Sequence, residues 1–138
     1  MEKTIFHLAL NVTDLNEACD FYSGLLGAKQ GRSTDTWMDF DFFGHQLSLH
    51  IGDTLKSEDT GKVDNVTVPI PHFGIILPLD SWKSMAKKLM NANIEFVIPP
   101  TIRFENQACE QYTMFFIDPF GNPLEFKSFM DMKEVFNT

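Results

Sequence analysis

Two histidines and one glutamate occupy matched positions of an internal repeat, and together they have the chemistry of a metal site. His7 begins the segment His-Leu-Ala-Leu, and His72 begins the related segment His-Phe-Gly-Ile 65 residues later (72 minus 7). Glu125 lies near the end of a second repeated segment. Two imidazoles and one carboxylate are the facial triad that binds Fe(II) and similar divalent ions. The sequence therefore predicts that His7, His72 and Glu125 are metal ligands.

The second repeated segment indicates how many ligands the protein supplies. Residues 41–49 align without a gap on residues 118–126, an offset of 77 (118 minus 41). In this alignment Ser48 is the counterpart of Glu125. A serine hydroxyl is a poor metal ligand, so the repeat predicts three protein ligands rather than four. Three ligands leave neighbouring coordination positions open for water or for a bidentate substrate.

Two further residues are candidates for catalysis. His50 lies two residues after Ser48 and shares its strand face. It could ligate the metal after a register shift, act as a base, contact substrate, or simply face solvent near the strand end. Tyr112 could supply a hydroxyl as an acid or a hydrogen-bond donor. These interpretations stay open at the level of the sequence.

The elements that carry these residues follow from periodicity and turn chemistry. Alternation predicts strands, while apolar residues at helical spacing after Asp14 and Glu17, which have capping-box spacing, predict a helix. The first half thus predicts a strand over 5–12, a helix from Asp14 to Gly27, and hairpin strands over 36–42 and 46–51. The second half predicts a strand over 72–78, a helix from Asp80, a strand over 94–98 stopped by Pro99-Pro100, and hairpin strands over 112–117 and 123–129.

Each half therefore has the pattern βαβββ, with one strand of each set weakly signalled. The predicted fold class is α+β, with two βαβββ modules in tandem that share one core. We expect a single domain of 138 residues. Its predicted parts are module 1 over about 4–52, a linker over about 53–70, module 2 over about 71–130, and a short tail over 131–138.

Composition narrows the classes of partner. The chain has 11 Lys and Arg against 19 Asp and Glu, a formal net charge of −8, and no basic cluster. This balance argues against a nucleic-acid partner and against an anionic membrane surface. Cys19 and Cys109 lack a metal-type spacing, and the N-terminus lacks a signal-peptide pattern. We expect reduced thiols and a cytoplasmic location.

The chain resembles the vicinal oxygen chelate superfamily, which includes glyoxalase I, extradiol ring-cleaving dioxygenases and bleomycin-resistance proteins. The segments that carry the resemblance are residues 6–15, the helix end from Phe21-Tyr22 to Leu25-Leu26-Gly27, Pro71-His72-Phe73-Gly74, and the hairpin over 118–126. The resemblance implies sheets curved around a shared cleft. It also implies a divalent metal held by His7, His72 and Glu125, with His50 and Tyr112 as candidate residues beside it.

Three functions are compatible with this resemblance. The first is a dioxygenase-like enzyme using Fe(II) or Mn(II) on a small substrate with two neighbouring oxygens. The second is a glyoxalase-like lyase or isomerase using Zn(II) or Ni(II), with Glu125 as base; Ser48 counts against it, because those members add a ligand at that position. The third is a non-enzymatic module that sequesters a small molecule. The resemblance also implies a homodimer.

Overall fold

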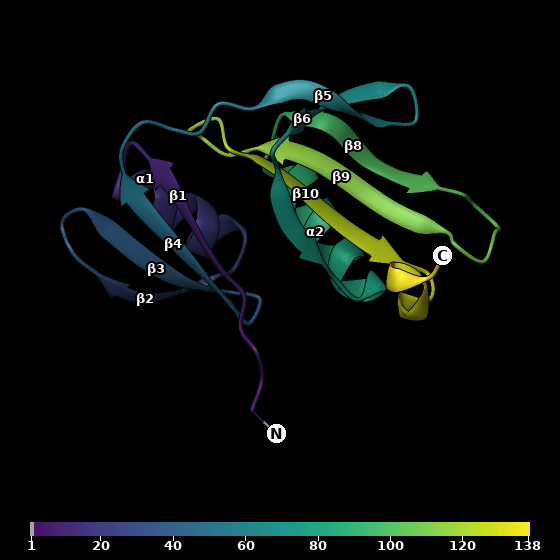
Figure 1. The fold of residues 1–138 in the computed structure, drawn as a ribbon, viewed down its shortest axis with the longest axis horizontal. Helices are drawn as coiled ribbons and strands as arrows, with labels where there is room; N and C mark the ends of the chain where they lie inside the picture. The colour runs from purple at the N-terminus through teal and green to yellow at the C-terminus, as the bar shows by residue number, and fades with distance from the viewer. Residues whose placement is uncertain (1) are drawn as a thin grey trace. The chain divides into compact units, whose positions relative to one another are not determined.

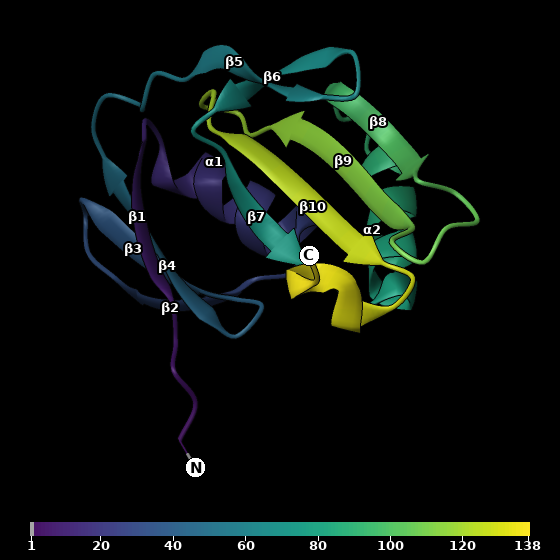
Figure 2. The same cartoon turned by 45° about the vertical axis from the view of Figure 1, so that its right-hand side comes forward.

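The computed structural model describes residues 2–138, and the chain folds into two compact units (Figure 1; Figure 2). The first unit extends to Lys56 and includes Pro119–Asn122. The second contains Ser57–Asp118 and Pro123–Thr138. The division falls inside the predicted linker over about 53–70. The α+β class and the tandem βαβββ arrangement are confirmed, and the single domain stays a prediction.

The first unit contains a four-stranded sheet with one helical segment. The strand order is β1-β4-β3-β2, and β1 pairs parallel with β4 while the other pairs are antiparallel. The β3–β4 hairpin turns through Phe43 and Gly44, whose φ values of 53° and 88° are those that a two-residue turn requires. The strands are β1 (His7–Val12), β2 (Lys29–Ser33), β3 (Trp37–Phe42) and β4 (His45–Ile51).

The helical segment covers one face of this sheet. It consists of α1 (Leu15–Cys19) and the π-helical turn η1 (Asp20–Leu25). The predicted cap is present, because the Asp14 carboxylate accepts a hydrogen bond from the Glu17 N–H at 2.9 Å. Tyr22 is fully buried, and its ring lies 6.0 Å from that of Phe40, between centroids. Alternation along each strand leaves the opposite face to the polar side chains.

The second unit repeats the order of strands around a longer helix. Its main sheet has the order β7-β10-β9-β8, with β7 parallel to β10, and a separate hairpin pairs β5 with β6. None of the helices in residues 2–138 has the length and apolar character of a membrane span. The elements are β5 (Glu58–Val63), β6 (Val66–Ile70), β7 (Phe73–Ile76), α2 (Leu79–Asn91), β8 (Phe96–Arg103), β9 (Gln111–Ile117), β10 (Pro123–Phe129) and the 3-10 turn η2 (Met132–Phe136).

Strand pairing confirms the internal repeat residue by residue. In the first unit Ala9 is the partner of Ser48 in the parallel β1–β4 ladder. In the second unit Gly74 is the partner of Glu125 in the parallel β7–β10 ladder. These two pairs are related by the same offsets of 65 and 77 that align the sequences. The repeat is therefore structural, and Ser48 and Glu125 are equivalent positions.

Strand β8 and the β5–β6 hairpin differ from the expectations, and β2 was expected only as a weakly signalled strand without bounds. Strand β8 continues through Pro99 and Pro100 to Arg103, although the prolines were expected to stop it. It can do so because β8 is the edge of its sheet, where a proline removes no necessary donor, and its register shifts between Ile98 and Thr101. The β5–β6 hairpin was not expected, because the six residues Glu58–Val63 contain a single large apolar side chain.

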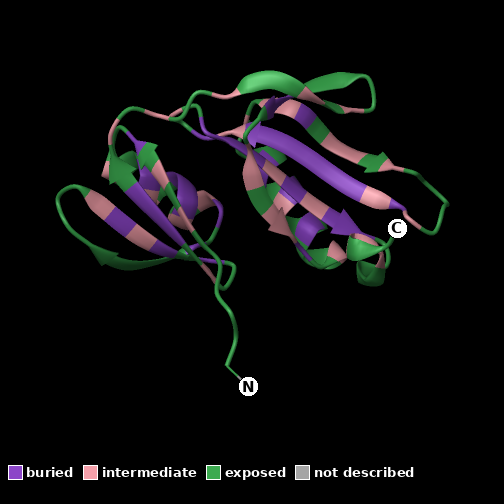
Figure 3. Ribbon diagram, in the orientation of Figure 1, coloured by how far each residue is buried: buried purple, intermediate pink, exposed green. Residues whose placement is uncertain are grey.

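Helix α2 packs on the face of its sheet opposite Glu125. Trp82, Ala86 and Leu89 are buried along the predicted apolar stripe. The Trp82 indole Nε1–H donates to the backbone oxygen of Phe126 at 2.9 Å, and its ring lies 5.5 Å from the ring of Tyr112. Strand β9 is buried almost throughout its length (Figure 3). The helix thus fixes β9 and β10, the strands that carry Thr113 and Glu125.

Replacing Trp82 with Phe should therefore destabilise the second unit. The variant keeps an aromatic ring but removes the indole N–H that donates to the Phe126 carbonyl, and loss of one such hydrogen bond costs about 0.5–1.5 kcal/mol. Urea unfolding followed by circular dichroism measures the change. Ser84→Ala, at an exposed position of the same helix, is the matched control and should change stability by no more than about 0.5 kcal/mol. Equal unfolding free energies for Trp82→Phe and the parent would contradict the assigned bond.

Candidate metal centre

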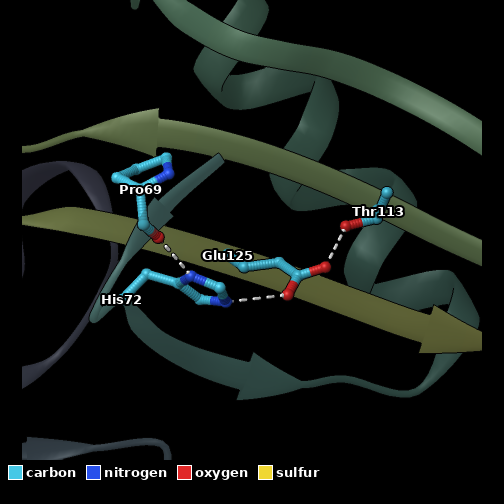
Figure 4. Close-up of polar contacts among 4 residues, drawn as sticks. All are labelled: Pro69, His72, Thr113 and Glu125. Atoms are coloured by element: carbon cyan, nitrogen blue, oxygen red, sulfur yellow. Dashed lines mark hydrogen bonds and ion pairs between the residues drawn. The ribbon is translucent and has the colours of Figure 1, made fainter. Parts of the chain in front are cut away.

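His72 and Glu125 face each other in the second unit (Figure 4). The Nε2 atom of His72 lies 3.3 Å from Oε1 of Glu125, and the two side chains are 21% and 13% exposed. His72 immediately precedes β7, and Glu125 lies in the middle of β10. The parallel ladder between these strands brings together residues that are far apart in the sequence.

The other ring nitrogen of His72 determines what the pair can do. Nδ1 lies 2.7 Å from the backbone oxygen of Pro69. A carbonyl oxygen only accepts, so Nδ1 must carry the hydrogen. In the neutral ring, Nε2 then presents a lone pair to a carboxylate oxygen, which also only accepts. Two acceptors at this distance need a positive charge between them, supplied either by a proton on Nε2 or by a metal cation.

The carboxylate of Glu125 is oriented by the neighbouring strand. Its second oxygen, Oε2, accepts a hydrogen bond from the Thr113 hydroxyl at 2.5 Å. Thr113 lies on β9 and is 1% exposed. The rings of His72 and Phe115 make a T-shaped contact, with ring centroids 4.9 Å apart at an interplanar angle of 76°. Phe115 is itself buried in a cluster with Val68 of β6. Such support fixes the orientation of both side chains.

A glycine permits this arrangement. A Cβ atom at Gly74 would overlap the backbone oxygen of Glu125, so only a residue without a side chain allows β7 to lie this close to β10. The matched position in the first unit is Ala9, which has a Cβ. The close approach is therefore specific to the unit that holds the His72–Glu125 pair.

In the first unit, His7 lies at the exposed start of β1. Its Nδ1 atom is 2.8 Å from Oε1 of Gln46, its partner in the β1–β4 ladder. Ser48, the counterpart of Glu125, is buried, and its hydroxyl donates to Oδ1 of Asp39 at 2.6 Å. Ser48 thus has a partner of its own, and its exclusion from the ligand set stays a prediction.

His50 lies on the same face of β4, beside an open pocket of the first unit. Its side chain is exposed, and its ring lies 6.4 Å from that of Trp37, its neighbour on β3. The pocket has a volume of about 490 Å³. The residues that line it are Ala9, Leu10, Asn11, His50, Asp53, Thr54, Leu55 and Lys56. His50 is thus available to a molecule bound in this pocket.

Tyr112 lies on the other face of its sheet. Its ring contacts Trp82 of α2, and its hydroxyl donates to Oε2 of Glu110 at 2.6 Å. Along β9 the side chains alternate, so Thr113 rather than Tyr112 shares the face of Glu125. The structure does not bring Tyr112 to the His72–Glu125 pair. The hairpin register, in which Ile117 is the partner of Pro123, is the signal that would have identified Thr113.

Within residues 2–138, no group of three or more His, Cys, Asp or Glu side chains gathers as a ready metal site. The structure brings together two of the three predicted ligands, His72 and Glu125. Ligation by His7 stays a prediction. The chemistry of the donor set fits a divalent cation, because a neutral imidazole nitrogen and a carboxylate oxygen already face the same point.

Comparison with known proteins gives the family. Residues 4–126 match the sequence model of the Glyoxalase/Bleomycin resistance protein/Dioxygenase superfamily. The chain belongs to this superfamily. A protein of the same description from Alicyclobacillus acidocaldarius has a similar structure, with 34% sequence identity, a TM-score of 0.79 and 96% of each chain covered. No curated protein matches the sequence.

More distant members of known structure share the fold. One is the fosfomycin resistance protein FosX from Listeria monocytogenes, with 17% identity, a TM-score of 0.70, and 97% of this chain and 98% of that chain covered. Another is a glyoxalase/dioxygenase from Nostoc punctiforme, with 16% identity, a TM-score of 0.68, and 94% and 92% covered. At these identities the likeness shows the superfamily fold alone.

The Tyr112–Glu110 pair should make stability fall more steeply at both ends of the pH range. The hydrogen bond to Glu110 raises the pKa of Tyr112 to about 12, and the same bond, with that from the Asn106 N–H, lowers the pKa of Glu110. Because the pKa of Tyr112 is higher in the folded state than in the unfolded chain, the protonated hydroxyl stabilises the fold fully below the unfolded pKa of about 10. This contribution is lost as the pH rises through the folded pKa of about 12. A lowered carboxyl pKa stabilises above the unfolded value and is lost on acidification.

Tyr112→Phe removes this pair and should be less stable than the parent near neutral pH. The difference between their unfolding free energies should become smaller above about pH 10 and below about pH 4.5. Unfolding free energies from urea titrations across the pH range measure this difference. Glu110→Gln removes the charge and keeps an acceptor for the hydroxyl, so it should flatten the alkaline limb as well. Parallel pH profiles for all three proteins would rule out the pair as the source.

Proposed function

We propose that this protein is a divalent-metal-dependent enzyme, most closely dioxygenase-like, that acts on a small molecule with two neighbouring oxygens. The observation that carries the proposal is the opposition of His72 Nε2 and Glu125 Oε1 at 3.3 Å, two acceptors that a cation would join. The ligand set would be His7, His72 and Glu125, with Fe(II) or Mn(II) favoured for two imidazoles and one carboxylate. Zn(II) and Ni(II) are the alternatives.

The three-ligand set supports the oxygenase interpretation over the glyoxalase-like one. A fourth ligand from the first module would stand at position 48, and Ser48 is buried and bonded to Asp39 instead. When bound, the metal would supply Lewis acidity to two substrate oxygens and leave a position for dioxygen. Fewer protein ligands mean more positions for these small molecules.

The residues of the chain would hold the reactants and move one proton. Thr113 fixes the Glu125 carboxylate through Oε2, and Phe115 holds the His72 ring through an edge-to-face contact. His50 faces the pocket beside Asn11, where a ring nitrogen would accept a proton from a substrate hydroxyl. The proposed partners are a small-molecule substrate and a second copy of the chain in a homodimer. Nucleic acid and membrane are not among the proposed partners.

Elemental analysis of the purified protein tests the metal. The parent, loaded anaerobically with Fe(II) or with Mn(II), should retain a stoichiometric amount after desalting. Glu125→Ala should lose it, and His50→Ala should keep it, because His50 acts on substrate and not on the metal. Loss in both variants would make His50 a fourth ligand and favour the glyoxalase-like interpretation. A parent without metal would leave only a binding module.

Removing the Thr113 hydroxyl should weaken metal binding without abolishing it. Thr113→Val keeps the shape of the side chain and deletes the donor to Oε2, and loss of such a partner lowers affinity by about 10–100-fold. Mn(II) titration of the metal-free variant measures the change. Thr101→Val, which loses only a hydroxyl bonded to the Pro99 carbonyl, is the control and should bind as the parent does. Equal affinities for all three proteins would remove Thr113 from the site.

The reaction class is tested by dioxygen consumption. The metal-loaded protein should consume dioxygen in the presence of catechol-type substrates and should release a ring-opened product. Oxygen-independent isomerisation of a hemithioacetal by the same preparation would overturn the oxygenase interpretation in favour of the glyoxalase-like one. Tight binding of the small molecule without turnover of either kind would identify a sequestering module.

A further inference from the structure

Four polar side chains form an unbroken hydrogen-bonded chain on the polar face of the first unit. The Ser48 hydroxyl donates to Oδ1 of Asp39 at 2.6 Å. The Gln46 side-chain amide donates from Nε2 to Oδ2 of Asp39 at 3.4 Å. Oε1 of Gln46 lies 2.8 Å from Nδ1 of His7. All four residues lie within three neighbouring strands, β1, β4 and β3.

The carboxylate of Asp39 fixes the direction of every bond in this chain. An ionised carboxylate only accepts, so both Ser48 and Gln46 must donate to it. With its NH₂ group turned toward Asp39, Gln46 presents its carbonyl oxygen to His7. That oxygen also only accepts, so the hydrogen of the neutral His7 ring must lie on Nδ1. The lone pair then lies on Nε2, which has no partner assigned in this chain of bonds.

We infer that Ser48, Asp39 and Gln46 are positioning residues that hold His7 with its hydrogen on Nδ1 and its Nε2 free to bind the metal. The inference rests on the proposed function, because it assigns these residues to one ligand of the proposed site. It also gives Ser48 a role. Ser48 occupies the position that Glu125, a proposed ligand, has in the second unit. In the first unit it instead anchors the carboxylate of Asp39, which orients the proposed ligand His7 through Gln46.

The second unit reaches the same state by a different contact. There the Pro69 carbonyl accepts directly from Nδ1 of His72, so that Nε2 again is the outward nitrogen. Two unrelated sets of partners thus select the same tautomer at matched positions of the repeat. A purely structural network that ties β3 to β4 and β1 would have no need of this coincidence. Neutral histidine in water favours the opposite tautomer, with the hydrogen on Nε2.

Nitrogen-15 NMR of the imidazole rings tests the inference on the metal-free protein. At a pH where the rings are neutral, His7 should show the shifts of a protonated Nδ1, assigned by the loss of its signals in His7→Gln. Gln46→Leu should move His7 toward the Nε2–H tautomer and weaken Mn(II) binding by about 10–100-fold. His72 is an internal control, and its Nδ1–H tautomer should persist in the same sample.

A reciprocal exchange separates positioning from a structural role. Gln46→Glu alone sets two carboxylates against each other, and Asp39→Asn alone lets the Gln46 amide turn either way. The double variant Asp39→Asn with Gln46→Glu restores every donor and acceptor. The amide introduced at position 39 would accept from Ser48 and donate to the carboxylate introduced at position 46, which would in turn accept from His7. We expect Asp39→Asn alone to lose the Nδ1–H signature and to weaken Mn(II) binding, and the double variant to recover both. Gln46→Glu alone keeps an acceptor for His7, so it should keep the Nδ1–H signature and instead lose stability through repulsion between the two carboxylates.

Asp41→Asn is the matched control, because it removes the same charge two residues along β3, from a carboxylate that accepts from the Gly44 N–H. It should leave the His7 tautomer and Mn(II) binding unchanged. A parent in which His7 carries its hydrogen on Nε2, or a double variant that fails to recover while its fold and His72 tautomer are intact, would overturn the inference. A parent that has the Nδ1–H signature but binds no Mn(II) would uphold the positioning of His7 and refute the proposed metal site.

Discussion

Parallel pairing between the early strand and the last strand of each module is the constraint on which the site depends. Because side chains in a ladder face each other in a fixed register, one pairing decides which residue of the early strand meets which residue of the last. The ladder places Gly74 beside Glu125 and so brings His72, two residues earlier, to the carboxylate. The same ladder in the first unit places His7 beside Gln46. A parallel pair also needs a long crossover, which the helix and hairpin of each module provide.

The two units have equivalent strands, but these strands place the carboxylate and the hydroxyl at different positions. In the second unit the last strand contributes a carboxylate, and the neighbouring strand contributes a hydroxyl that orients it. In the first unit the roles are exchanged: the last strand contributes the hydroxyl of Ser48, and β3 contributes the carboxylate of Asp39. A donor–carboxylate pair is therefore present in both units. In the second unit the carboxylate faces an imidazole directly, whereas in the first it reaches its imidazole through an amide.

Much of this framework was predictable from the sequence, because strong periodicity marks the elements that bury a face. The strands carrying His7 and Glu125 and the strand that follows His72 were expected, as were the cap at Asp14 and the equivalence of Ser48 with Glu125. Strand β2 was expected without bounds and β5 was missed, because Lys29–Ser33 and Glu58–Val63 are mostly exposed and polar. The contact of His72 with the Pro69 carbonyl could not be predicted, because a backbone oxygen leaves no mark on residue type. Tyr112 and Thr113 are neighbours on one strand, and only the hairpin register separates their faces.

A comparison of Glu110 with Glu125, two carboxylates of the second unit, shows why burial alone does not identify a site. Glu110 is 6% exposed, yet its oxygens accept from the Tyr112 hydroxyl and the Asn106 N–H, so each acceptor has a donor. Such a pair is complete, and its chemistry is expressed as the opposite pKa shifts of its members. Glu125 has one oxygen satisfied by Thr113 and the other directed at an imidazole whose hydrogen is on its far side. The incomplete pair is the one that needs a proton or a metal cation between its members, and it lies on the sheet face opposite α2.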